Sequence, residues 1–214
     1  MPITTLQNIS VPTEGANSNS SLLMPKLQYR FRVFLDNFGT IGGPDGVREV
    51  SRQVIDVTKP NLSFEQMTLD AYNSRTYLAG KHTWEPITLT LREDANNNVQ
   101  KIVGQQLQRQ FDFYEQSSAV SGGTYKFQTR IEMLDGGNGS QGPNVIDRFH
   151  LVGCYIESVN YNTLVYATSE PVTTTLTIRY DNAIQFGADE EFNGVGEPVV
   201  RSTNESPGGS MATS

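Results

Sequence analysis

The chain has 214 residues, which is enough for one domain with a real core, and its net charge of −7 and pI near 4.8 mark it as acidic. An acidic chain does not bind nucleic acid by neutralising phosphates, because that mode needs clustered Lys and Arg. The one cysteine, Cys154, excludes an internal disulfide framework and lies in an apolar run, so we expect a small core residue and not a nucleophile. No apolar run approaches the roughly 18 residues of a membrane span, and we expect a soluble chain without membrane binding.

The pattern along the chain predicts a β domain between two extended arms. Residues 1–25 are rich in Ser, Asn and Thr and predict an N-terminal arm, and residues 187–214 predict a flexible C-terminal tail. Between them, period-two alternation and turn residues predict a domain of strands at 26–35, 47–60, 61–72, 74–80, 85–93, 124–134, 148–161 and 171–186. Pro60 marks a turn, from which we expect a hairpin over residues 50–70.

One helix is predicted, over about 96–116. Asp94, Asn96 and Asn97 are candidate N-caps, and apolar residues then recur mostly at spacings of three and four. The other face is rich in glutamine and carries little charge, so a protein partner could cover it. The fold class is therefore mainly β, an antiparallel sandwich or barrel with a single flanking helix. The expected core anchors are Trp84, Leu89, Phe111 and Cys154.

The stretch GKHTWEPITLTLREDANNN (80–98) gathers a histidine, a tryptophan and several acids without forming a catalytic site. An extended strand rises about 3.3 Å per residue, which would place His82 roughly 40 Å from Asp94. No phosphate loop, nucleophile elbow or metal-ligand spacing is present, and the Gly-rich loop at 135–144 lacks the acids of a calcium site. We expect no catalytic residue, no metal and no cofactor.

Three stretches resemble the tail tube protein of contractile-tailed bacteriophages. They are MPKLQYRFRVFL (24–35), RTYLAGKHTWEPITLTLRED (75–94), which leads straight into the Asn-capped helix, and VTTTLTIRYDNA (172–183). The run at 84–94 is the most specific, and the resemblance spans 26–186. It implies a β-barrel or sandwich with one helix, whose six copies form a ring. Rings would stack into a hollow tube inside a contractile sheath, and the tube of type VI secretion (Hcp-like) shares this fold.

The resemblance also implies partners and a location. The partners are further copies of the chain, the tail sheath protein, and baseplate and tail-terminator proteins. The genome would pass through the lumen to the host without specific binding. The protein would be assembled in the host bacterial cytoplasm and reside in the virion. The alternatives are a tube-like initiator or terminator at the baseplate or neck, or a non-viral β-sandwich module that binds carbohydrate or calcium.

The tube hypothesis assigns roles to particular residues. If the charge of −7 were repeated in each of six copies, a ring would carry 6 × −7 = −42, and an acidic lumen would repel phosphates. The candidate lumen acids, which could equally be ordinary exposed acids, are Asp56, Glu65, Asp70 and Glu132. The loop at 36–47 and the hairpin at 50–70 are expected to contact other subunits, through Asn37, Phe38, Ile41, Val50, Lys59, Pro60 and Asn61.

Overall fold

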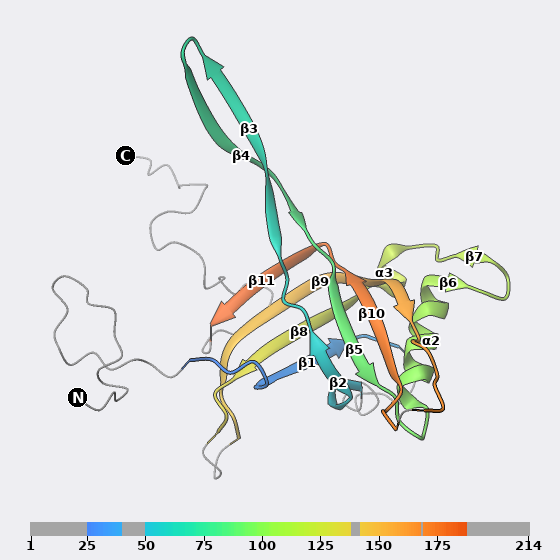
Figure 1. Cartoon of the computed structure of the whole chain (residues 1–214). Helices are drawn as coiled ribbons and strands as arrows, with labels where there is room; N and C mark the ends of the chain where they lie inside the picture. Colours follow the sequence, from blue (N-terminus) through green and yellow to red (C-terminus); the bar gives the residue numbers. More distant parts are fainter. Residues whose placement is uncertain (1–24, 40–49, 138–141, 168, 188–214) are drawn as a thin grey trace, which may run out of the picture. The chain divides into compact units, whose positions relative to one another are not determined.

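A computed structural model describes residues 25–39, 50–137, 142–167 and 169–187 (Figure 1). The predicted arm up to residue 24, the tail from residue 188 and Ile41 lie outside these ranges. The chain divides into two units, 1–30 and 31–214, and each is described by itself. In the first unit, the backbone N–H of Arg30 donates to the carbonyl of Leu27 at 3.2 Å, closing a turn. The strand predicted at 26–35 therefore begins only at Phe31.

Seven strands of the second unit form one antiparallel sheet that bends into two halves. The first half has the order β1 (Phe31–Asp36), β8 (Phe127–Leu134), β9 (Val145–Asn160) and β11 (Asn182–Gly187). The second half has the order β9, β10 (Thr173–Arg179), β5 (Ile87–Arg92) and β2 (Val54–Val57). This architecture confirms the predicted mainly β, antiparallel sandwich or barrel class.

The bend lies in β9, which takes part in both halves. Its first part pairs with β8 and β11, and its last part pairs with β10. Gly153, at the change of partner, has a φ of 72°, a left-handed conformation that favours glycine. A Cβ built on Gly153 would overlap the carboxylate of Asp181, which also pairs with the Lys126 ammonium at 2.5 Å. Glycine at this corner therefore lets the strand turn and lets Asp181 approach it.

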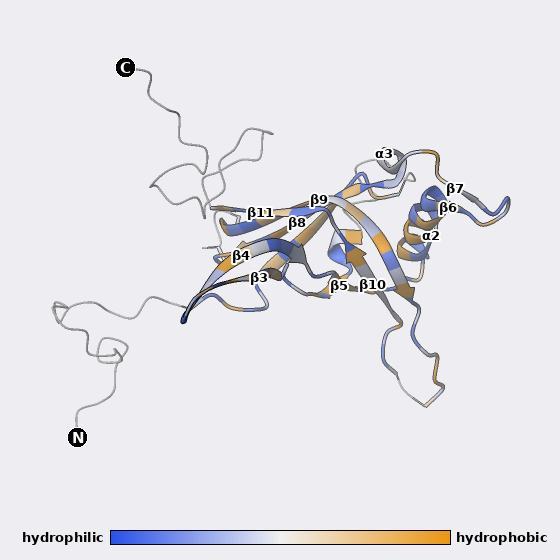
Figure 2. Ribbon diagram, turned by 90° about the horizontal axis from the view of Figure 1, so that it is seen from above, coloured by the Kyte–Doolittle hydropathy of each residue, from blue (hydrophilic) through white to orange (hydrophobic). Residues whose placement is uncertain are grey.

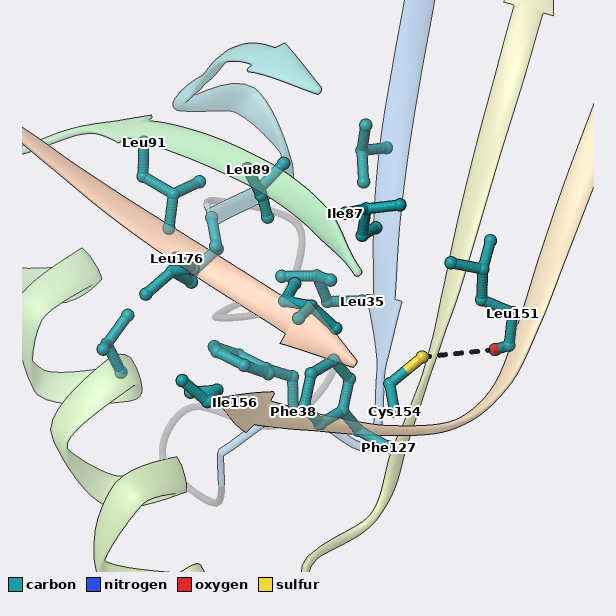
Figure 3. Close-up of a cluster of buried hydrophobic side chains, with 14 of the residues drawn as sticks. Leu35, Phe38, Ile87, Leu89, Leu91, Phe127, Leu151, Cys154, Ile156 and Leu176 are labelled. Atoms are coloured by element: carbon teal, nitrogen blue, oxygen red, sulfur yellow. Dashed lines mark hydrogen bonds between the residues drawn. The ribbon is translucent and has the colours of Figure 1, made fainter. Parts of the chain in front are cut away.

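The hydrophobic core fills the space between the two halves (Figure 3). Alternation along β5 explains which residues enter it, because Ile87, Leu89 and Leu91 are all fully buried and the threonines between them are only half-buried. Phe38 and Phe127 meet edge to face with ring centroids 4.8 Å apart. Figure 2 shows the same alternation of hydrophobic and hydrophilic residues along the strands.

The expected core anchors differ in their burial. Leu89 and Cys154 are fully buried, and the Cys154 thiol donates to the Leu151 carbonyl at 3.5 Å. Trp84 is partly buried and packs against the core, with its ring centroid 5.7 Å from that of Tyr180. Phe111 is 37% exposed and is not a core residue.

Phe111 is exposed because the helix ends earlier than predicted. Helix α2 spans Asn98–Gln110, and Phe111 is already extended in the short strand β6 (Phe111–Asp112), which pairs with β7 (Ser117–Ser118). The carboxylate of Asp112 accepts the backbone N–H groups of Tyr114 and Glu115, which makes a turn in place of the next helical turn. At the other end, Asp94 caps the helix by accepting from Asn98 N at 2.9 Å and Val99 N at 3.3 Å.

The glutamines of α2 do not all face outward. Gln106 is fully buried, accepts from Gly39 N at 3.1 Å and donates to the Tyr125 carbonyl in α3 (Gly122–Tyr125) at 2.6 Å. Gln110 donates to the Ile156 carbonyl at 3.0 Å and accepts from Ile156 N at 2.9 Å. The side-chain amide of Gln110 thus bonds to the N–H and the carbonyl of one β9 residue, as the backbone of a neighbouring strand would. This pair of bonds fixes the helix against the sheet.

The hairpin lies later in the chain than predicted. It consists of β3 (Leu62–Ala71) and β4 (Ser74–Trp84), joined by a turn at residues 72–73. The predicted hairpin over 50–70 is wrong, because residues 50–52 are helical and β2 pairs with β5 instead of β3. Pro60 marks the point where the chain leaves the sheet, and the hairpin turn itself contains neither glycine nor proline.

We expect Gly153→Ala to lower the free energy of unfolding by about 2 kcal/mol or more, because the new Cβ meets Asp181 and the left-handed φ is strained. The matched control is Gly104→Ala in α2, where no heavy atom lies within 4 Å of a built Cβ. That change should raise stability by about 1 kcal/mol through helix propensity. Urea unfolding of both variants checks the pair, and equal effects would contradict the assigned corner.

Candidate functional site

The β3–β4 hairpin stands away from the bent sheet (Figure 1). Within the described residues its strands pair only with each other, and every hairpin residue is exposed except Gly80 and Trp84, which are half-buried. An isolated two-stranded hairpin is marginally stable in water, because neither face is covered. A ribbon of ten and eleven residues per strand therefore points to a partner surface that stabilises it.

The outer part of the hairpin has one apolar face and one polar face. Cross-strand partners share a face, so the pairs Met67–Leu78 and Leu69–Thr76 lie together. Met67, Leu69 and Leu78 are 48%, 52% and 43% exposed. We call these three residues the apolar face. The opposite face holds Thr68, Tyr77 and the ion pair of Asp70 with Arg75 at 2.6 Å.

A bulge separates this outer part from the base of the hairpin. The register shifts between Phe64 and Gln66, where a Cβ on Gly80 would lie 2.9 Å from the carbonyl oxygen of Glu65. The two backbones approach closely there, and glycine permits it. Bulges increase twist, so this one sets the direction in which the outer part extends.

Exposed apolar residues also lie on the loop between β9 and β10, which is described over residues 161–167 and 169–172. Leu164 is 76% exposed, Val165 is 55% exposed and Tyr166 is fully exposed. These residues border an open hollow of about 700 Å³, which is also lined by Pro171 and Val172. The sequence analysis missed this surface, although the run YNTLVY between two strands was a usable signal.

The outer face of the first half-sheet carries a network of charges around Glu132. Glu132 lies between Arg32 on β1 and Arg148 on β9 in one row of the sheet. Its carboxylate is 2.5 Å from Arg32 Nε and 2.9 Å from Arg148 Nε, and only 2% of its side chain is exposed. Two cations therefore hold one buried carboxylate, which is the arrangement that makes a buried charge tolerable.

The neighbouring row extends this network. Arg130 pairs with Asp36 at 2.8 Å and lies 4.9 Å from the ring centroid of Phe34, a cation–π contact. His150, only 3% exposed, hydrogen bonds with Gln128 at 3.2 Å. Burial, and then the positive charge of Arg130, lowers the pKa of His150 below its ordinary value.

Three of the four predicted lumen acids are exposed, and the fourth is buried. Asp56 is exposed on edge strand β2, and Glu65 and Asp70 are exposed on the hairpin. Glu132 is a correction: it is buried under arginines because both flanking strands place a guanidinium beside it. Alternation alone assigned it to the polar face, but could not show that cross-strand arginines cover it.

The charge is also not spread evenly along the chain. The described residues contain 14 Lys and Arg and 15 Asp and Glu, a net charge of −1, so the remaining residues carry −6 of the total −7. Of the −42 that six full-length copies would carry, 6 × −6 = −36 therefore lies on residues outside the described ranges.

The predicted contact residues fall into two groups. Asn37, Lys59 and Asn61 are exposed, and Pro60 is half-buried. Phe38 and Val50 are buried at 1% and 0% exposure, so their side chains are core and cannot meet another subunit. Loop position had suggested a surface role, but Phe38 turns inward onto Phe127.

Reactive groups do not converge in the described part of the chain. No three His, Cys, Asp or Glu side chains gather there as a metal site would require. Burial raises the pKa of the Cys154 thiol to about 11, so the reactive thiolate is scarce at neutral pH. The Asp135 carboxylate accepts from Gly137 N and Asn144 N within its own loop. No described helix is long and apolar enough to span a membrane.

Three solved structures of contractile injection systems contain chains with a similar fold. A chain in the tube-terminating cap of the anti-feeding prophage matches with a TM-score of 0.56 and 13% identity, over 79% of this chain and 95% of that chain. A chain in the prophage baseplate matches at 0.53 and 14%, over 78% and 99%. A chain in the extended PVC sheath–tube complex, from an extracellular contractile injection system, matches at 0.54 and 13%, over 76% and 92%.

No protein-family model and no curated protein matches the sequence. The likeness to the injection-system chains therefore concerns the fold. The chain has the fold of tube, cap and baseplate proteins of contractile injection systems, which confirms the fold expected from the tail-tube resemblance.

We expect Glu132→Gln to lower the free energy of unfolding by roughly 2 kcal/mol, because it removes the charge of a carboxylate that is only 2% exposed and that pairs with Arg32 and Arg148. Glu157→Gln is the matched control, since Glu157 pairs with Arg179 at 3.2 Å on an exposed surface. Its effect should be far smaller. Chemical denaturation of both variants measures the difference, and similar losses would refute the buried network.

Stability should fall as the pH drops below about 6.5, the ordinary histidine pKa. The folded pKa of His150 is lowered, so the unfolded chain binds more protons in this range and acidification favours unfolding. His150→Gln should flatten the dependence between pH 7.5 and 5.5 in thermal unfolding. His82→Gln, on the exposed hairpin, controls for loss of an imidazole as such. An unchanged slope in His150→Gln would argue against the assignment.

Proposed function

We propose that the protein is a structural tube subunit, without enzymatic activity, whose hexameric rings stack inside a contractile sheath as a phage tail tube. The observation that carries the proposal is the β3–β4 hairpin, which has an apolar face and no cover within the described chain. The fold it shares with chains of a sheath–tube complex, a tube cap and a baseplate supports the same role.

The hairpin suits contact between successive rings. Ten residues at about 3.3 Å each span about 33 Å, which is long enough to reach well into another subunit. Burial of Met67, Leu69 and Leu78 against that subunit would stabilise both the contact and the hairpin. Asn37, Lys59 and Asn61 are exposed and belong to the proposed contact set.

Edge strands suit contact within a ring. Strands β1, β11 and β2 each have one hydrogen-bonded neighbour in the described structure. Pairing or covering these edges with neighbouring subunits would close the sheet around a ring and protect edges that otherwise invite aggregation. Residues 1–25 and 187–214 are proposed to remain arms outside this domain, reaching neighbouring subunits or the sheath.

The proposed partners follow from the tube role. They are further copies of the chain, a sheath protein, and baseplate and terminator proteins of the virion. The genome would pass through the lumen without specific binding, and Asp56, Glu65 and Asp70 are the acids proposed to face it. A second candidate, a cap or initiator at one end of the tube, is favoured by the cap chain with its TM-score of 0.56. Self-limited growth would distinguish a cap from a repeating tube subunit.

We expect the purified, concentrated protein to form hollow rods in negative-stain electron microscopy, because stacking covers the apolar face. Met67→Ser combined with Leu69→Ser should leave rings without rods. Tyr77→Ser removes an exposed aromatic from the opposite face and is the matched control, which should still form rods. Single rings of the native protein at every concentration would favour the cap, and dispersed monomers would contradict both assemblies.

A further inference from the structure

We propose that the described part of the β9–β10 loop (161–167 and 169–172) of one copy receives the apolar face of the β3–β4 hairpin from the next copy. This inference rests on the proposed tube function and assigns the acceptor that stacking requires. The proposed occupant of the hollow beside the loop is therefore a second copy of this chain.

The two surfaces lie at opposite ends of β5. At one end, the hairpin base adjoins β5, where Glu85 N donates to the Asn61 carbonyl at 3.0 Å. At the other end, Glu93 N donates to the Val172 carbonyl at 2.9 Å, which places the loop there. Figure 1 shows the hairpin and the loop leaving the sheet in different directions from these ends. Surfaces at opposite ends of a subunit can meet only between copies.

The surfaces also match in shape and chemistry. The hairpin offers a narrow projecting ribbon whose apolar face, with Ala71, Ser74 and Thr76 in line, carries no charge. The loop offers a hollow of about 700 Å³ bordered by Leu164, Val165 and Tyr166, with Glu170 its one charged lining residue. The uncharged apolar face and the nearly uncharged hollow do not attract a polyanion or a lipid headgroup, but they can bury each other.

Hydrogen bonds at the base of the loop fix its two ends relative to each other. Asn162 has a left-handed φ of 55°, and its side-chain amide donates to the carbonyl and the hydroxyl of Thr173, both at 2.8 Å. These bonds join the two limbs where they leave β9 and β10. Leu164 and Tyr166 therefore project beyond a fixed neck, and a prepared acceptor loses little entropy on binding.

A contact between two different surfaces continues from copy to copy. Such heterologous contacts build open stacks, whereas a contact of one hairpin with another is isologous and stops at a pair. The growth of a tube requires the first kind. Each chain therefore has one surface that inserts, the hairpin, and one surface that receives, the loop.

The test uses two full-length variants, one with Leu164→Ser and Tyr166→Ser in the loop, and one with Met67→Ser and Leu69→Ser in the hairpin. Each alone should raise the critical concentration for rods by about a hundredfold, as the loss of two buried apolar side chains implies. Mixed, they should form two-layer stacks, because one keeps its hairpin and the other keeps its loop. Tyr77→Ser is the control that keeps native rod formation, and thermal unfolding verifies that every variant is folded.

The outcomes separate this inference from the proposed function. Native rods with a loop variant that also forms rods would overturn the loop as acceptor and leave the tube function standing. Native rods with two defective variants that do not complement each other would show that the hairpin docks elsewhere. Failure of the native protein to form rings or rods would instead refute the tube function on which the inference depends.

Discussion

The turn of β9 at Gly153 is the constraint on which the rest of this structure depends. One strand of sixteen residues pairs with β8 and β11 and then with β10, and this change of partner folds a single sheet over itself. The enclosed space is the core, and the direction of every other strand follows from it. Lys126 and Asp181 lie beside the corner, where their ion pair packs against the glycine backbone. No larger residue leaves room for that carboxylate.

Polar side chains hold several elements in position against this sheet through hydrogen bonds and ion pairs. Gln110 makes two hydrogen bonds with the backbone of β9, Gln106 joins the loop at Gly39 to α3, and Arg109 donates to carbonyls on both sides. Glu132 similarly joins three strands through arginines. Bonds of this kind are directional, so they set the position of the helix and the register of the strands, where apolar packing alone would tolerate sliding.

Some apolar surfaces and strand edges have no partner within the described part of the chain. The apolar face of the hairpin, the rim of the β9–β10 loop and the edges of β1, β2 and β11 all face away from the enclosed core. In the proposed tube, contacts between rings would cover the first two, and contacts within a ring would cover the strand edges.

The sequence by itself determined the elements whose signal is local. Alternation predicted β5, β8 and β9 and the mainly β class, the residues at 94–98 predicted the helix start, and the apolar setting of Cys154 predicted burial. The single strand predicted over 171–186 is two strands, β10 and β11, because the chain turns at residues 180–181. The tertiary structure decided what depends on residues far apart. It joined β3 to β4 instead of β2, ended α2 at Gln110, buried Glu132 between cross-strand arginines and turned Phe38 inward. Hydrophobic periodicity and turn-forming residues carry information only about residues that are close together in the sequence. Strand pairing, the cover of a charge and the exposure of a hairpin arise from contacts between segments, and no single stretch contains them.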